Sequence, residues 1–168
     1  MTNETKKTIA VEDEHTAFMD EALALAKGNL SSLEGGPFGA VVVKDGVVVG
    51  RGANNVTSLN DPTAHAEIVA IRDACKNLNS FQLDGCIIYS SCEPCPMCLG
   101  AIYWARPSKL FFAAGREDAA LAGFDDSYIY TQIPLPTAER DLSTTQLDSE
   151  KAVEIFQAWI QANNKTPY

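Results

Sequence analysis

Two short segments of the sequence carry side chains that can hold a metal and move protons. The first is His65–Glu67 (HAE) and the second is Pro94–Cys98 (PCPMC). Zinc takes imidazole and thiolate ligands in tetrahedral geometry, and a catalytic zinc site keeps three protein ligands and one open position. We therefore predict a zinc site built from His65, Cys95 and Cys98.

The spacing of these residues requires both segments to lie at helix starts. Cys95 and Cys98 are three residues apart, so on a first helical turn their sulfurs face the same side. The pair Asp61-Pro62 before the first segment is typical of an N-cap followed by proline at the first helical position. Glu67, two residues after His65, would then lie beside the metal as a non-ligand acid that takes and delivers protons.

Other interpretations of the cysteines remain open at this point. A lone CxxC pair can be a redox pair or half of a structural metal site. A closed structural site needs a fourth ligand, and Cys92 is available three residues before Cys95. In such a site Glu67 would have no role. Cys75 and Cys86 lie in apolar helix and strand patterns and are expected to be core thiols.

Charge and hydrophobicity limit the class of protein. The 168 residues include 13 Lys and Arg against 22 Asp and Glu, a net charge of −9 at pH 7. Because cationic side chains supply most of the affinity for phosphates, this balance argues against a nucleic-acid partner and favours a small substrate. The longest apolar runs are far shorter than the roughly 20 residues that span a membrane. With no secretory or transit pattern at its start, the chain is expected to be cytoplasmic, with cysteines that bind metal rather than form disulfides.

The hydrophobic pattern predicts one α/β domain over residues 1–168, in which a polar segment over residues 1–12 is flexible and His15 is solvated. Strands that alternate with helices after an opening hairpin around Asp45-Gly46 indicate a mixed sheet with helices on both faces. The remaining expected elements are a helix over 13–30 that ends at Gly28-Asn29, a helix over 61–77, a strand over 86–90, a helix from Pro94 or Pro96 to Trp104, a strand over 109–113, a short helix over 118–122 and a helix over 149–163 with Val153, Phe156 and Ile160 on one face.

Longer stretches around the two motifs resemble a known family. His65–Glu67 and Pro94–Cys98 together resemble the cytidine deaminase-like superfamily of zinc deaminases. The stretches GGPFGAVVVKDG, NNVTSLNDPTAHAE, SSCEPCPMCLGAIYWARP and AGFDDSYIY are similar to bacterial guanine deaminases, from about Phe18 to Tyr130. This resemblance implies a three-layer αβα sandwich with a mixed five-stranded sheet, one zinc ion per subunit, and hydrolysis of guanine to xanthine and ammonia.

The resemblance also implies roles for individual residues. His65, Cys95 and Cys98 would hold zinc, and Glu67 would shuttle protons. The positions that match substrate contacts of the family are Phe38, Asn54, Ala66, Trp104, Asp126 and the terminal Tyr168, with Asp126 also acting as a second acid near the leaving amino group. The segment over residues 131–168 would close the site and be exchanged between the subunits of a homodimer.

The chemistry of a purine base is consistent with these roles. Guanine presents N1–H and 2-amino donors, which need an acceptor such as Asp126, while Asn54 can donate to the 6-oxo oxygen and accept elsewhere. Phe38 and Trp104 can stack on the ring, although each also has a purely structural interpretation. Cytosine, guanosine and tRNA adenosine are alternative substrates, the last disfavoured by the net charge. A non-catalytic, zinc-stapled interaction module is the alternative from another class, and it leaves Glu67 without a role.

Overall fold

The chain forms two compact units, Met1–Asp126 and Ser127–Tyr168, and each is described by itself. The fold is taken from a computed structural model, which describes the backbone of residues 3–168 and the side chains of residues 14–168. The side chains of residues 1–12, which the sequence predicts to be flexible, lie outside the described residues. No helix within the described part of the chain combines the length and the apolar character that crossing a membrane requires.

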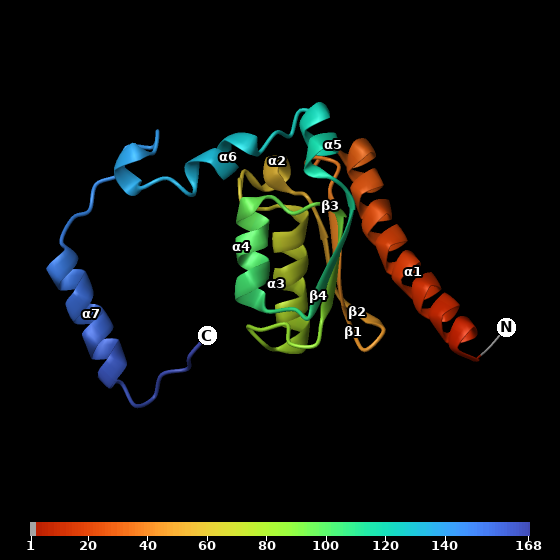
Figure 1. The fold of residues 1–168 in the computed structure, drawn as a ribbon, viewed down its shortest axis with the longest axis horizontal. Helices are drawn as coiled ribbons and strands as arrows, with labels where there is room; N and C mark the ends of the chain where they lie inside the picture. The colour runs from red at the N-terminus through yellow and green to blue at the C-terminus, as the bar shows by residue number, and fades with distance from the viewer. Residues whose placement is uncertain (1–2) are drawn as a thin grey trace. The chain divides into compact units, whose positions relative to one another are not determined.

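The first unit is built on a four-stranded sheet with the order β2-β1-β3-β4 (Figure 1). The strands are β1 (Gly39–Lys44), β2 (Val47–Ala53), β3 (Ile87–Cys92) and β4 (Lys109–Ala114). Strand β1 pairs antiparallel with β2 and β3, whereas β4 runs parallel to β3. The sheet is mixed, as predicted, but the expectation of five strands is wrong for the described residues. Directly after β4, the Asp118 carboxylate accepts a hydrogen bond from the backbone N–H of Gly115 (2.9 Å) and starts a helix instead.

Helices cover both faces of this sheet, which confirms the layered α/β arrangement. Helix α1 (Asn3–Ser32) lies on one face, and α3 (Ala66–Leu78) and α4 (Pro96–Ala105) lie on the other (Figure 1). Strand β1 divides the core, because successive side chains of a strand point to opposite faces. Ala40 and Val42 pack in the cluster with α3 and α4, and Val41 and Val43 in the cluster with α1. Two short helices, α2 (Val56–Leu59) and α5 (Arg116–Leu121), complete the first unit.

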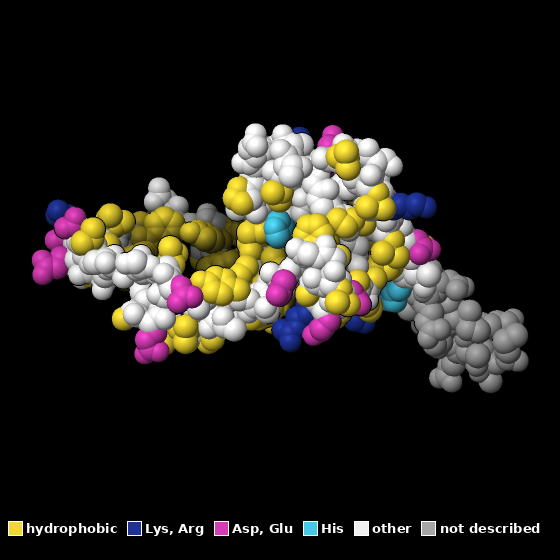
Figure 2. Space-filling model, turned by 90° about the horizontal axis from the view of Figure 1, so that it is seen from above, with side chains coloured by type: hydrophobic (Ala, Val, Ile, Leu, Met, Phe, Trp, Pro, Cys, Tyr) yellow, Lys and Arg dark blue, Asp and Glu magenta, His cyan; other side chains and the backbone are white. Residues whose placement is uncertain are grey.

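The second unit is helical and leaves its apolar side chains uncovered. It contains α6 (Ser127–Gln132), a 3-10 turn (Thr137–Glu139) and α7 (Ser149–Gln161), which begins at the predicted residue and ends two residues early. The apolar residues Val153, Phe156 and Ile160 of α7 are 50%, 68% and 64% exposed. Apolar side chains reach the surface in both units (Figure 2).

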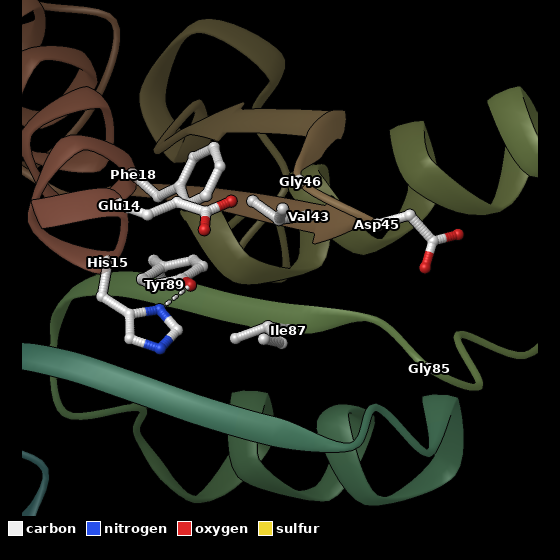
Figure 3. A pocket seen from close by; sticks show the side chains of 9 residues that line it. All are labelled: Glu14, His15, Phe18, Val43, Asp45, Gly46, Gly85, Ile87 and Tyr89. Carbon is white, nitrogen blue, oxygen red and sulfur yellow. Dashed lines mark hydrogen bonds between the residues drawn. The ribbon is translucent and has the colours of Figure 1, made fainter. Parts of the chain in front are cut away.

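Helix α1 is anchored to the sheet by a polar contact that the sequence does not reveal. His15, expected to be solvated, is half-buried, and its Nδ1 lies 2.6 Å from the Tyr89 hydroxyl (Figure 3). Its ring also packs against Phe111, with the centroids 4.6 Å apart. His15 and Tyr89 border a cavity of about 110 Å³ that Glu14 and Asp45 also line. The contact joins residues 74 positions apart, so no local pattern could predict it.

The same helix continues through the pair Gly28-Asn29, where the sequence predicts its end, to Ser32. Asn29 is buried within the helix, and its side-chain amide donates to the backbone carbonyls of Gly36 (2.9 Å) and Asn54 (2.7 Å). The asparagine therefore ties the helix to two loops rather than terminating it.

Helix α3 begins at Ala66 with His65 as its N-cap, four residues after the predicted start at Pro62. The Asp61 carboxylate oxygen accepts hydrogen bonds from the backbone N–H (2.8 Å) and hydroxyl (2.7 Å) of Thr63. This is a side-chain-stabilised turn, a conformation that competes with helix initiation. The turn delivers the chain to His65, so the imidazole still lies at a helix start. Helix α4 starts as predicted, with Cys95 as the N-cap and Pro96 next.

Glycines on β2 let the strand approach α3 closely. A Cβ atom at Gly52 would lie 2.0 Å from the carbonyl oxygen of Ala66, and one at Gly50 would lie 2.5 Å from that of Ala70. The facing helix residues are themselves small and fully buried. This contact sets the height of the first turn of α3 above the sheet, and that turn follows the predicted imidazole ligand.

We expect Gly52→Ala to lower the free energy of unfolding by about 1–3 kcal/mol, because the added methyl group must displace the helix backbone. Urea denaturation measures this. Gly28→Ala is the matched control: a Cβ there meets no atom within 4 Å, so in a helix it should stabilise by about 0.5–1 kcal/mol. Unchanged stability of Gly52→Ala would contradict the close approach.

Candidate metal centre

Three side chains from two helix starts meet on one side of the sheet. His65 caps α3, Cys95 caps α4, and Cys98 lies in the first turn of α4. Their ligand atoms all lie within 4.8 Å of one another. The His65 Nδ1 and Cys95 Sγ atoms are 3.6 Å apart, and two such atoms bound tetrahedrally to one zinc ion are also about 3.6 Å apart. The donor set and its spacing therefore fit zinc, and the predicted ligand group is brought together.

The conformation of the two cap residues explains how the ligands converge. His65 (φ −67°, ψ 155°) and Cys95 (φ −62°, ψ 168°) are both extended, and neither uses its side chain to cap its own helix. Their side chains are therefore available to bind a metal at the N-terminal ends of the two helices. A helix N-terminus also carries partial positive charge, which stabilises a nearby thiolate.

The electrostatics of the sulfurs favour metal binding. A hydrogen bond from Cys98, helped by His65, lowers the pKa of Cys95 to about 4, so this residue is a thiolate at neutral pH. The pKa of Cys98 is raised, chiefly by its hydrogen bond to Cys95 and also by burial. The pKa of His65 is raised, chiefly by its hydrogen bond with Cys95. A divalent cation among the three stabilises both sulfurs as thiolates and releases the shared protons.

Glu67 lies beside this group without belonging to it. Its side chain is only 6% exposed, and burial is the main reason that the pKa of its carboxyl is raised. The Ser90 hydroxyl donates to Oε1 (3.3 Å), and the Cys98 thiol donates to Oε2 (3.4 Å). A buried carboxyl with a raised pKa next to a metal site is suited to proton transfer. Sequence reasoning missed Ser90, although a serine pair in an otherwise apolar buried strand was a usable signal.

The remaining cysteines do not complete a four-ligand site. The Cys92 thiol donates to the backbone carbonyl of Gly115 (3.6 Å), and burial raises its pKa to about 11, so it remains a thiol. It is not among the ligand atoms that cluster. Burial also raises the pKa of Cys75 and Cys86, as expected of core thiols. This geometry therefore favours a three-ligand site over the closed structural site that would use Cys92.

Four predicted substrate contacts belong to the first unit, as the metal-ligand group does. Asn54, directly after β2, is 5% exposed, and Ala66 is fully buried at the first position of α3. Phe38, just before β1, packs edge-to-face on Phe124 with centroids 4.9 Å apart. The pKa of Asp126 is raised, chiefly by burial and next by the negative charge of Cys95, so its carboxyl lies within electrostatic range of the centre. Sequence analysis did not single out Phe124, although it stands in the stretch AGFDDSYIY.

The arrangement within each unit does not test two of the predicted contacts. Trp104 lies six residues beyond Cys98 in α4, about 9 Å along the helix axis at 1.5 Å per residue, and is 66% exposed. Tyr168 belongs to the second unit and is 72% exposed. Their roles remain predictions.

Comparison with known proteins agrees with this site. Residues 12–114 match the family described as the cytidine and deoxycytidylate deaminase zinc-binding region. The chain is 55% identical over 154 residues to the guanine deaminase of Bacillus subtilis, covering 92% of this chain and 99% of that protein. The crystal structure of guanine deaminase from Bacillus subtilis superposes with a TM-score of 0.89, at 55% identity, over 92% of this chain and 98% of that one. A tRNA-specific adenosine deaminase of Agrobacterium fabrum is 45% identical over 101 residues, 60% of this chain and 66% of that protein.

We expect the purified chain to hold about one zinc ion, because a catalytic site needs only the three clustered ligands. Cys95→Ser and Cys98→Ser should each lose most of the metal, since a hydroxyl is a poor zinc ligand. Cys92→Ser is the matched control and should keep it. Elemental analysis after dialysis measures the zinc content. Loss of zinc from Cys92→Ser would contradict the three-ligand site.

Proposed function

This chain belongs to the cytidine and deoxycytidylate deaminase zinc-binding family, and on that basis we propose that it is a zinc-dependent hydrolase that converts guanine to xanthine and ammonia. The observation that carries the choice of substrate is the similarity to guanine deaminase over almost the full length of both chains. Relatives that act on tRNA match a smaller share of this chain. The net charge of −9 is also unfavourable for binding RNA.

His65, Cys95 and Cys98 are the residues that hold the zinc ion. When bound, zinc acts as a Lewis acid that makes hydroxide available near neutral pH. The reaction forms a bond from a water oxygen to C2 of guanine and breaks the bond from C2 to the amino nitrogen. The protein must therefore remove protons from water and supply one to the departing nitrogen.

We assign these proton transfers to Glu67. Its carboxylate takes one proton from the attacking water and delivers it to a ring nitrogen. It then takes the second proton from the hydroxyl added at C2 and passes it to the amino group, which leaves as ammonia while the C2 oxygen becomes a carbonyl. Burial supports the assignment, because it raises the pKa of the carboxyl toward the pH at which it can both accept and donate. The Ser90 hydroxyl donates to Oε1 and holds that oxygen in place, whereas Cys98 gives up its proton when it binds zinc.

The base itself is bound by groups around the centre. Asp126 accepts hydrogen bonds from the donor edge of guanine and assists the departure of ammonia, in line with the electrostatic effect of Cys95 on its pKa. Asn54 binds the oxo edge, and Phe38, held by Phe124, stacks on the ring. The assigned substrate contacts are Phe38, Asn54, Ala66 through its backbone N–H, Trp104, Asp126 and Tyr168.

The assembly that we infer is a homodimer in which residues 131–168 are exchanged. The uncovered apolar side of α7 supports this, because a helix with this pattern is stabilised mainly by burying it. On the first unit, Tyr103 and Trp104 of α4 are 75% and 66% exposed, and Phe112 on the edge strand β4 is 48% exposed. A cytoplasmic location agrees with thiols that must remain reduced to bind metal.

Glu67→Gln should lower guanine turnover by about 10² or more, because the amide cannot carry the proton. The assay follows the release of ammonia and the formation of xanthine, with the wild type beside the variant. Adenine, cytosine and guanosine are tested as alternative substrates. Zinc content should stay unchanged in the variant. Full activity of zinc-loaded Glu67→Gln would rule out the mechanism, and wild-type activity on another base but not guanine would rule out the substrate.

Tyr168→Ala should lower kcat/KM for guanine by about 10-fold if the terminal ring closes the site over the base. Tyr168→Phe keeps the ring and is the control. The wild type should also hydrolyse guanosine poorly, because a ribose would clash with that ring. Kinetics on both substrates test this, and unchanged values for Tyr168→Ala would exclude the terminal residue as a lid.

A further inference from the structure

We infer that Asn29 is a positioning residue that holds Asn54 so that it presents only hydrogen-bond donors to the base. Such a site selects a purine with an oxo oxygen at position 6 over one with an amino group there. The inference rests on the proposed function, because it takes Asn54 as the residue that meets this edge of the base.

The first step is the bonding of Asn29 itself. Its side chain is 4% exposed inside α1, and its two amide hydrogens match two acceptors. One is the backbone carbonyl of Gly36 at 2.9 Å, and the other is that of Asn54 at 2.7 Å. Gly36 and Asn54 belong to different loops, one before β1 and one after β2. A single buried amide therefore bridges the two loops, in addition to the backbone hydrogen bond from the N–H of Asn54 to the carbonyl of Phe38 (3.1 Å).

The second step is the orientation of the Asn54 side chain. Its Oδ1 accepts from the backbone N–H of Gly36 (3.3 Å) and from that of Val56 (3.2 Å). A backbone N–H can only donate, so the opposite amide orientation would place donor against donor twice. Both lone pairs of Oδ1 are thus committed, and Nδ2 is the end of the amide that is left for a ligand. The sequence-based expectation that Asn54 uses both halves of its amide on the base does not agree with this arrangement.

The third step is the close approach of the two loops. A Cβ atom at Gly35 would lie 2.3 Å from Oδ1 of Asn54, so only glycine allows the loop to reach that oxygen. At Gly36, a Cβ atom would lie 3.0 Å from the rings of both Phe38 and Phe124. The hydrogen bonds of Asn29 therefore hold the loop that contacts both the side chain of Asn54 and the rings of Phe38 and Phe124.

The chemical consequence is a preference between two closely related bases. Guanine and 2,6-diaminopurine both carry the 2-amino group that is hydrolysed. At position 6, guanine offers an oxygen that accepts a bond from Nδ2, whereas 2,6-diaminopurine offers an amino group. A buried donor that meets another donor is left unpaired, which is the stronger form of rejection.

The test compares kcat/KM for guanine with that for 2,6-diaminopurine. We expect the wild type to favour guanine by at least about 10-fold. Asn29→Ala should reduce this ratio by about 5-fold or more, because turnover of 2,6-diaminopurine gains nothing from the Nδ2 bond and falls less. If Asn29→Ala is too unstable to assay, Asn29→Leu replaces it, because leucine fills a similar space and has no donor. It should reduce the substrate ratio by the same amount.

Asn77→Ala is the matched control, because Asn77 also donates to a backbone carbonyl, that of Val49 at 2.9 Å, on the outer strand. It should leave the substrate ratio unchanged, and because Asn77 is exposed, its loss should lower thermal stability less than the loss of Asn29. An equal loss of activity on both bases in the Asn29 variants would show a merely structural role and overturn the inference. A wild type that does not discriminate would also overturn it. A wild type that hydrolyses neither base would instead refute the proposed function.

Discussion

The close packing of α3 on the sheet brings the metal-ligand group together. Gly50 and Gly52 remove the side chains that would hold the helix away, and alanines face them from the helix. The first turn of α3 therefore lies at a height where its cap, His65, meets the cap of α4. Because both caps are extended, an imidazole and two sulfurs converge within bonding distance of a single ion.

Burial gives this group its chemistry. Removing Glu67 from water disfavours its charged form, and the same environment keeps Cys92 a neutral thiol. Cys95 differs because hydrogen bonds and a helix end stabilise its negative charge. One small region thus contains a stabilised thiolate and a carboxyl with a raised pKa. Both serve a zinc-dependent deamination, since a cysteine binds zinc as a thiolate while a proton carrier must change its charge readily.

The residues that we propose to contact the base lie mainly on loops rather than at helix starts, and one buried asparagine and two glycines help to order these loops. Asn29 connects the loop before β1 to the loop after β2, and Gly35 and Gly36 allow the contact. The ring of Phe124, from beyond α5, supports Phe38 at the same place. Hydrogen bonds of this kind decide whether the Asn54 side chain offers a donor or an acceptor to a ligand. Purines differ in whether they present an acceptor or a donor at position 6.

Local signals in the sequence were enough to find the HAE and PCPMC motifs, the start of α4, the hairpin and the two further apolar strands. The sequence was misleading where one local pattern is compatible with two structures. Asp61 forms a turn instead of capping a helix, and Gly28-Asn29 lies inside a helix instead of ending it. The fifth strand came only from the family resemblance and had no strand pattern of its own in the sequence. Tertiary structure alone decided the contacts of Asn29, Ser90 and His15, whose partners lie 25, 23 and 74 residues away. The physical reason is that a hydrogen bond between distant segments depends on how helices and strands pack, and that packing leaves no periodic trace in the residues it joins.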